Sequence, residues 1–211
     1  MTKQHPFSIL ASAKQPIIFF AVFGLLLALL FSFLRPLLYS STVRLLVIQQ
    51  LGTVDAYTAG RSAERIADDL ATAVYTTDFY ELVMASGLGI DKNYFGTDEI
   101  KKRKKWGEAV STSVSRGSGF LTIKVFHEDV SQAEQIGRGV ASVLTTEGWK
   151  YTGGGNITIS LVDAPLNSRW PVKPNIPANA FSGLVLGLLA GSGYVLLREQ
   201  TNDRRHQVMH G

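Results

Sequence analysis

Residues 167–197 read NSRWPVKPNIPANAFSGLVLGLLAGSGYVLL, and this stretch decides how the chain is organised. No charged side chain lies between Lys173 and Arg198, a gap of about 24 residues, and an α-helix needs roughly 20 apolar residues to cross a bilayer core. A single span must be helical to satisfy its backbone in lipid, so residues 179–197 predict a transmembrane helix. The proline-rich lead-in, residues 167–178, is expected to be stiff and extended. Its prolines are Pro171, Pro174 and Pro177.

Three glycines recur every four residues in this apolar segment: Gly183, Gly187 and Gly191. A step of four residues turns an α-helix by about 400°, so the glycines form one slowly drifting stripe. A stripe without side chains lets another helix approach closely. We predict that it is a packing face for assembly in the membrane. The alternative is that glycine is simply common in membrane helices.

A second apolar segment lies near the N-terminus, where residues 17–34 are interrupted only by Ser32 and no charge occurs between Lys14 and Arg35. Residues 16–38 therefore predict another transmembrane helix. A cleaved signal peptide is the alternative, because basic residues precede the apolar run. We favour a retained helix, since the run is long for a signal core and LRPLLYSS offers no small-x-small cleavage site.

Two spans would place the tails, residues 1–15 and 198–211, on the same side of the membrane. The Lys and Arg counts of the tails and of the flanks of the intervening domain are nearly balanced, so charge alone leaves the orientation open. A long loop is translocated largely regardless of its charge. We therefore expect residues 39–166 to lie outside the cytoplasm and both tails to be cytoplasmic.

Residues 39–166 are enough for one domain with its own core. Strand signals occur at 39–50, 111–116, 120–127 and 156–162. Helical periodicity occurs at 55–75, 78–86, 97–110 and 129–149. We expect Thr77 or Asp78 to cap the second helix, Thr97 to take part in capping the third, and residues 87–96 to be a loop. The order predicts an α+β domain with a mixed sheet of about four strands packed by helices.

Two of these patterns also predict core residues. Within 120–127, alternation places Leu121, Ile123 and Val125 on one face of the strand. Within 129–149, one stripe of the helix faces inward, and its members are Ala133, Ile136, Val140 and Leu144.

The composition excludes several kinds of chemistry. The 211 residues include no cysteine, which excludes disulfides, thiolate catalysis and cysteine-type metal sites. The net charge of +4 is too small to indicate nucleic-acid binding. There is no glycine-rich loop of Walker type, so the chain is not itself a P-loop kinase. His127, Glu128 and Asp129 lie at a strand-to-helix junction, where a cap at Asp129 explains them better than catalysis. We predict no catalytic residue, no cofactor and no metal.

One basic run stands out, and it comprises Lys101, Lys102, Arg103, Lys104 and Lys105. It is a candidate patch for an anionic ligand such as lipid phosphate or an acidic glycan. Five consecutive residues on a helix point nearly all round it, so they cannot all face one ligand. A solvated helix end is the alternative interpretation.

Four stretches, taken in this order around two spans, carry a family resemblance. They are YSSTVRLLVIQQ, DAYTAGRSAERIADDLATAVYTTDFYELV, GFLTIKVFHEDVSQAEQIGRGVASVL and LVDAPLNSRWPVKPNIPANAFSGLVLGLLAG. The chain resembles the bacterial polysaccharide co-polymerases, the Wzz or chain-length-determinant family. The residues that match the proline segment and the glycine pattern of that family are Pro165, Pro171, Pro174, Pro177, Gly183, Gly187 and Gly191.

The resemblance implies a multi-pass protein of the bacterial inner membrane whose domain faces the periplasm or the outside. It implies a non-enzymatic homo-oligomeric scaffold, in contact with membrane lipid and with a polysaccharide polymerase or exporter. Such a scaffold would regulate the chain length or export of lipopolysaccharide O-antigen, capsule or exopolysaccharide. The alternative is an adaptor that activates a separate cytoplasmic tyrosine kinase. An enzyme acting on extracytoplasmic glycan is the third and least favoured hypothesis.

The chain departs from the large members of that family in two places. Trp149 is followed almost at once by three glycines and the last strand, so the long helical arm of those members is expected to be missing. Only about 14 residues follow the second span, and none is a tyrosine. We therefore expect a short, adaptor-like form without a fused kinase.

Overall fold

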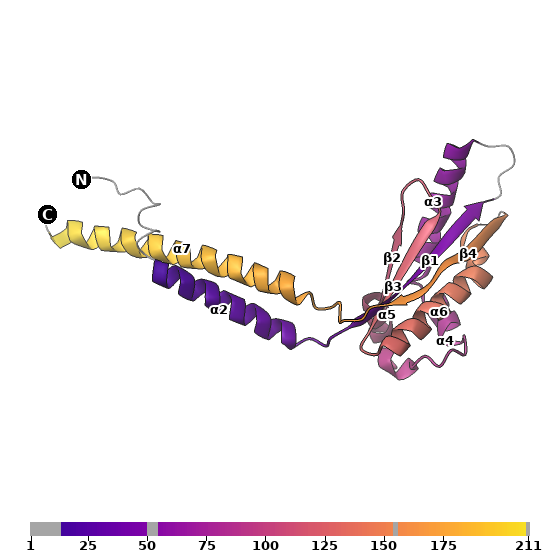
Figure 1. The fold of residues 1–211 in the computed structure, drawn as a ribbon, viewed down its shortest axis with the longest axis horizontal. Coiled ribbons are helices and arrows are strands. Elements are labelled where there is room, and N and C mark those ends of the chain that lie inside the picture. Colours follow the sequence, from indigo (N-terminus) through magenta and orange to yellow (C-terminus); the bar gives the residue numbers. More distant parts are fainter. Residues whose placement is uncertain (1–13, 50–54, 154–155, 210–211) are drawn as a thin grey trace. The chain divides into compact units, whose positions relative to one another are not determined.

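The computed structural model describes residues 14–49, 55–153 and 156–209, and Figure 1 shows the chain as a ribbon. The chain forms two units, which are described separately here. One is a pair of helices, α2 (Lys14–Phe33) and α7 (Ile176–Met209). The other is an α+β domain, Leu37–Val172.

The domain is built on a four-stranded sheet with the order β2-β3-β1-β4 (Figure 1). The inner strands are β1 (Tyr39–Gln49) and β3 (Phe120–His127), which pair antiparallel with Val43 opposite Ile123. The outer strands are β2 (Val110–Val114), which pairs with β3, and β4 (Ile157–Asn167), which pairs with β1. Both outer pairs are also antiparallel.

The predicted mixed sheet is therefore wrong. Parallel pairing requires that the two strands joined by a helical crossover become neighbours. Here β3 lies between β1 and β2, and β1 lies between β3 and β4, so each crossover leaves a gap that an antiparallel strand fills. This β-α-β-β-α-β order is the ferredoxin-like, split arrangement.

In the described part of the domain, four α-helices and two short 3-10 helices form the helical layer. The α-helices are α3 (Ala56–Ala73), α4 (Thr77–Met84), α5 (Glu99–Ala109) and α6 (Val130–Glu147). The 3-10 helices are η1 (Lys92–Phe95), which lies within the stretch that was expected to be a loop, and η2 (Gly148–Tyr151).

The core of the domain lies between these helices and one face of the sheet. All three predicted residues of β3 and all four of the predicted α6 stripe are fully buried. On β1, Val43, Leu45 and Val47 are buried, while Arg44 and Ile48 on the opposite face are exposed. Burial of this apolar surface is the main stabilising term of the domain, at roughly 25 cal/mol per Å².

Side-chain caps fix where the helices of the domain begin. Asp129 and Asp55 cap α6 and α3, each accepting a hydrogen bond from a backbone N–H of the first turn. For α4 the cap is Thr76, and the expected Thr77 or Asp78 is wrong. For α5 it is Asp98, whose carboxylate accepts from the Lys101 N–H at 3.1 Å, and the expected Thr97 is wrong. In both cases the residue that caps the helix is next in sequence to a predicted one, and both residue types are favourable caps.

The last strand is longer than predicted. β4 continues beyond residue 162 to Asn167 and includes Pro165. Proline has no N–H to donate to a sheet ladder. In β4 this is tolerated because the strand lies at the edge of the sheet, where proline is found.

The two apolar helices have different bounds from those predicted. α2 ends at Phe33 and not at residue 38, because Pro36 disfavours helical backbone at Arg35. α7 begins at Ile176, so Pro177 lies in its first turn, where no N–H is required. The Asn175 side chain accepts a hydrogen bond from the Ala178 N–H at 3.2 Å and marks this start.

α7 also continues through the expected C-terminal tail to Met209. The sequence REQTNDRRHQVM that follows the apolar segment contains neither proline nor glycine, so no residue there ends the helix. By length and composition, Lys14–Phe33 and Ile176–Glu199 are long and apolar enough to cross a membrane.

Candidate functional site

The predicted glycine stripe of α7 faces α2 of the same chain. A Cβ added at Gly183 or Gly187 would collide with backbone oxygens of α2, and one added at Gly191 would lie only 3.0 Å from the Ile17 Cα. Gly183, Gly187 and Gly191 face, in this order, Gly24, Phe20 and Ile17. The two helices therefore run antiparallel and touch backbone to backbone, as small residues allow. A role of the stripe in joining copies of the chain stays a prediction.

A polar contact joins the helix pair inside its apolar surface. The Asn179 Nδ2 donates a hydrogen bond to the Ser32 hydroxyl at 2.7 Å. Ser32 is buried at the contact. In an apolar surrounding such a bond fixes the register of two helices, because any sliding leaves both polar groups unpaired. Asn179 was not predicted as a contact residue from the sequence, although a polar residue inside an apolar span is itself a signal.

The family-matched prolines lie in different structural contexts. Pro165 is in β4, Pro177 is in the first turn of α7, and Pro171 and Pro174 lie in the irregular segment between them. The peptide bond before Pro174 is cis.

Within the domain, the segment after β4 is tied to the segment that opens β1. The Ser168 N–H donates to the Ser40 carbonyl at 2.8 Å, and the Val172 N–H donates to the Leu38 carbonyl at 2.7 Å. The two ends of the domain therefore leave it side by side, as a domain inserted between two antiparallel helices requires.

The basic run on α5 is not one patch. Lys102 is 2.8 Å from Glu99 and 4.0 Å from Glu81. The Arg103 Nε donates to Thr77, and the Lys105 Nζ donates to the Tyr94 carbonyl at 2.6 Å. Only two members, Lys101 and Lys104, have no side-chain partner among the described residues. The anionic-ligand role stays a prediction, and this geometry favours the solvated helix end.

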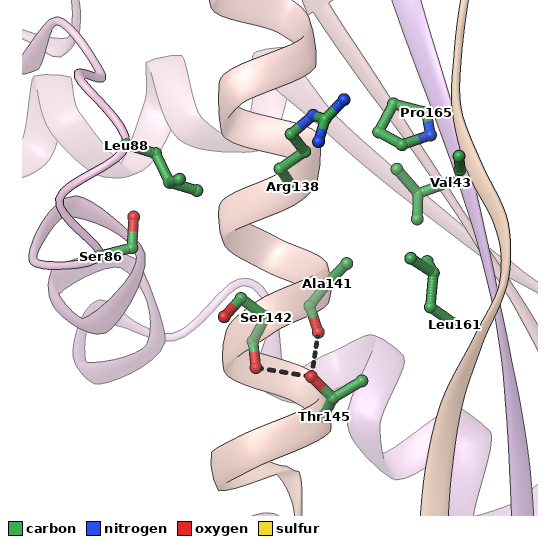
Figure 2. A pocket seen from close by; sticks show the side chains of 10 residues that line it. Val43, Ser86, Leu88, Arg138, Ala141, Ser142, Thr145, Leu161 and Pro165 are labelled. Atoms are coloured by element: carbon green, nitrogen blue, oxygen red, sulfur yellow. Dashed lines mark hydrogen bonds between the residues drawn. The ribbon is translucent and has the colours of Figure 1, made fainter.

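A groove of about 350 Å³ opens on the domain beside α6. Figure 2 shows α6 with Ser86 and Leu88 on one side and with Val43, Leu161 and Pro165 on the other. Val43 is fully buried, whereas Leu161 is exposed. The remaining lining residues are Arg138, Ala141, Ser142, Thr145 and Ala164. Most of the lining is apolar, as in sites that bind small ligands.

The polar groups of this groove are already engaged or lack an activating partner. The Arg138 guanidinium donates to Glu134 at 2.7 and 3.0 Å, and the other Glu134 oxygen accepts from Asn167 at 2.6 Å. The Asn167 and Arg138 hydrogen bonds lower the pKa of Glu134. The Thr145 hydroxyl donates to carbonyls of its own helix (Figure 2). The lining holds no nucleophile–base pair, so the groove is suited to binding and not to acid–base chemistry.

His127 is the buried histidine of the predicted junction, and its side chain is 6% exposed. The Asp129 N–H donates to its Nδ1 at 3.0 Å, and its ring centroid is 4.1 Å from that of Tyr94. Burial lowers the pKa of His127, and this effect is larger than the opposite effect of the carboxylates of Asp129, Glu128 and Asp91, which raise it. The neutral ring thus takes part in packing at the start of α6. The described residues contain no cluster of His, Asp and Glu side chains placed to hold a metal ion.

No protein-family model matches the chain, and a comparison with curated proteins finds no match either. The resemblance to the co-polymerases therefore remains an expectation, and the function follows as a proposal.

Proposed function

We propose that the chain is a non-enzymatic membrane scaffold that regulates the chain length or export of a bacterial surface polysaccharide. The observation that carries the proposal is the architecture. Two helices that are apolar enough to span a membrane pack against each other through a glycine stripe. In the sequence they precede and follow one α+β domain, and the two ends of that domain lie side by side. The polysaccharide is the part of the proposal that comes from the family resemblance alone, since fold does not fix function.

In this proposal the helix pair anchors the chain in the inner membrane and the domain faces the periplasm or the outside. Several copies assemble and hold a polymerase or exporter. The distribution of exposed residues supports the anchor, because the outer surface of the helix pair consists of large apolar side chains such as Phe23, Leu26 and Leu186. An exposed apolar surface of this kind in a folded chain indicates contact with lipid or protein.

A scaffold is preferred over an enzyme because of the chemistry of the groove and the core. Arg138, the one cationic residue that lines the groove beside α6, forms an ion pair with Glu134 of the same helix. The buried titratable ring, His127, packs against Tyr94 and receives a backbone hydrogen bond. Hydrolysis of a glycan would need two carboxyl groups facing a common space, and the residues that line the groove include none.

Electrophoresis of surface polysaccharide from cells that lack the chain, beside their parent, tests the proposal. We expect a collapsed or shifted length distribution that the wild-type chain restores. An unchanged distribution with an unchanged amount would overturn the polysaccharide role. Glycan hydrolysis or transfer by the purified chain would overturn the non-enzymatic role.

A second candidate function is an adaptor for a separate cytoplasmic tyrosine kinase. The continuation of α7 to Met209 favours it, because the helix extends for about ten residues beyond its apolar segment. At a rise of about 1.5 Å per residue this is roughly 15 Å of helix, a length on which a partner can dock. Removal of residues 202–211 should then abolish partner phosphorylation while the assembly stays intact. Phosphorylation that survives this truncation would exclude the segment as the contact.

A further inference from the structure

A second cleft lies on the helix pair, at the end where α2 begins and the apolar part of α7 finishes. Its volume is about 640 Å³. It is lined by Gln15, Pro16, Phe19, Phe20, Tyr194 and Arg198. Only residues of α2 and α7 contribute, so the cleft belongs to the helix pair alone.

The lining has a polar level and an aromatic level. Gln15 and Phe19 are four residues apart on α2, and Tyr194 and Arg198 are four residues apart on α7, so each pair lies along one helix face. Because the helices are antiparallel, Gln15 and Arg198 come at the outer end of the cleft. Phe19 and Tyr194 then lie one turn deeper, towards the apolar middle of the helices.

The aromatic level is built from contacts between rings. The ring centroids of Phe20 and Tyr194 are 5.4 Å apart, which joins the two helices beneath the cleft. Phe19 stacks on Phe23 at 6.3 Å with an interplanar angle of 7°, and this pair continues the apolar wall along α2. Phe19 is 66% exposed, so the wall is open to whatever surrounds the helix pair.

The polar level carries the guanidinium of Arg198. Among the residues that the structure describes, none forms an ion pair or a side-chain hydrogen bond with Arg198. Lys14, one residue before the cleft, is also exposed. Among the side chains that the structure describes, Glu199 is the acidic one nearest in sequence to Arg198, and the helix turns it about 100° away. The outer end of the cleft is therefore suited to an anion, while its inner end is apolar.

We propose that this cleft binds the phosphate headgroup of an anionic bilayer phospholipid. The inference rests on the proposed membrane location. The guanidinium of Arg198 matches a phosphate with two parallel N–H donors. Tyr194, which is amphipathic, has the side chain found at the level of lipid headgroups, and the Phe19–Phe23 wall accepts an acyl chain. Basic pockets between membrane helices bind anionic headgroups in this manner.

Native mass spectrometry of the purified full chain in detergent tests the assignment, with dioleoyl phosphatidylglycerol as the probe and dioleoyl phosphatidylcholine as the uncharged comparison. We expect the wild-type chain to retain one phosphatidylglycerol per copy in preference to phosphatidylcholine. Arg198→Gln should weaken this binding about tenfold, the loss expected when one charge-assisted contact is removed. The matched control is Arg35→Gln, which removes the same charge after the other end of α2 and should leave the affinity unchanged.

A second pair of variants keeps the test decisive if Arg198→Gln fails to fold. Phe19→Ala shortens the apolar wall and should weaken retention of phosphatidylglycerol. Phe31→Ala, which removes a phenylalanine of similar exposure (65% against 66%) from the far end of the same helix, should not.

Three results would overturn the proposal. The first is equal retention of phosphatidylglycerol and phosphatidylcholine by the wild-type chain. The second is an equal loss of phosphatidylglycerol retention in each variant and its control. The third is displacement of phosphatidylglycerol by a polyprenyl phosphate at lower concentration. The ligand that supplies the phosphate would then be a lipid-linked sugar carrier and not a bilayer phospholipid. Each readout is independent of polysaccharide length, so failure of this site and failure of the proposed function are distinguishable.

Discussion

The helix pair and the α+β domain are held together in opposite ways. In the domain, large apolar side chains such as Trp106 and Phe79 fill the centre, and the outer surfaces of α3 and α6 are largely polar. In the helix pair, the contact is made by glycine backbone, and the large apolar side chains point outward. The hydrophobic effect in water drives the first arrangement. Close van der Waals packing and an interhelical hydrogen bond drive the second, as expected where lipid surrounds the helices.

The largest change in the free energy of unfolding is expected from Trp106→Ala, in the core of the domain. The ring is 2% exposed, contacts Tyr80 and Phe95, and donates from Nε1 to the Val74 carbonyl at 2.8 Å. Removal should lower the free energy of unfolding of the domain by about 3–5 kcal/mol. Urea unfolding of the full chain in detergent measures it.

Trp170→Ala is the control for that measurement, because Trp170 is 79% exposed. We expect a change within about 0.5 kcal/mol. A similar cost for both substitutions would contradict the assignment of Trp106 to the core.

The second largest effect is expected in the helix pair, from Gly187→Leu. The new side chain would collide with the backbone of Phe20, so the helices must separate, at a cost of about 1–3 kcal/mol. Unfolding of the helix pair by titration with a denaturing detergent measures this cost. A sizing column tests in addition whether the assembly of copies weakens.

Gly193→Leu is the matched control, since a Cβ added at Gly193 meets no atom of the described residues within 4 Å. Equal effects of the two substitutions would show that the stripe has no special role, and that glycine is merely common in this helix.

Much of this contrast was predictable from the sequence, because it depends on local periodicity. The alternation of β3 and the inner stripe of α6 led directly to residues that are buried. Which strands become neighbours was not predictable in this way. The antiparallel insertion of β3 between β1 and β2 depends on packing across the whole domain, and no local pattern in 39–166 carries it.

The candidate site was predictable in part. The spacing of the glycines identified a packing face, but the face of α2 that it meets has a single glycine, Gly24, with Ala21 and Ala28 beside it. The cleft at Tyr194 and Arg198 combines two i,i+4 pairs from opposite ends of the chain. Only the three-dimensional structure brings such pairs together.

A smaller effect is expected from Asn179→Ala, which removes the interhelical hydrogen bond to Ser32. Bonds of this kind between membrane helices contribute about 0.6 kcal/mol on average and up to about 1.7 kcal/mol. A double-mutant cycle with Ser32→Ala, followed by detergent unfolding, measures the coupling energy. Strictly additive losses would show that the two side chains do not interact.

The smallest effect is a pH dependence that is confined to the domain. Because burial lowers the pKa of His127 below 6.5 in the folded chain, folding favours the neutral ring. The stability from this group is fully present above pH 6.5 and decreases as the pH falls from there towards the folded-state pKa. Urea unfolding between pH 7.5 and 5 should show this decrease in the wild-type chain and a flatter profile in His127→Gln. Identical profiles would contradict the role of His127.

The polysaccharide length distribution of cells that carry the Gly187→Leu chain tests the central claim most directly, namely that an anchored assembly sets polymer length. These cells should be compared with cells that carry the wild-type chain, Gly193→Leu or no chain, at matched protein levels. We predict that Gly187→Leu gives the distribution of cells without the chain and that Gly193→Leu gives the wild-type distribution. A distribution that is unchanged even in cells without the chain would contradict the account.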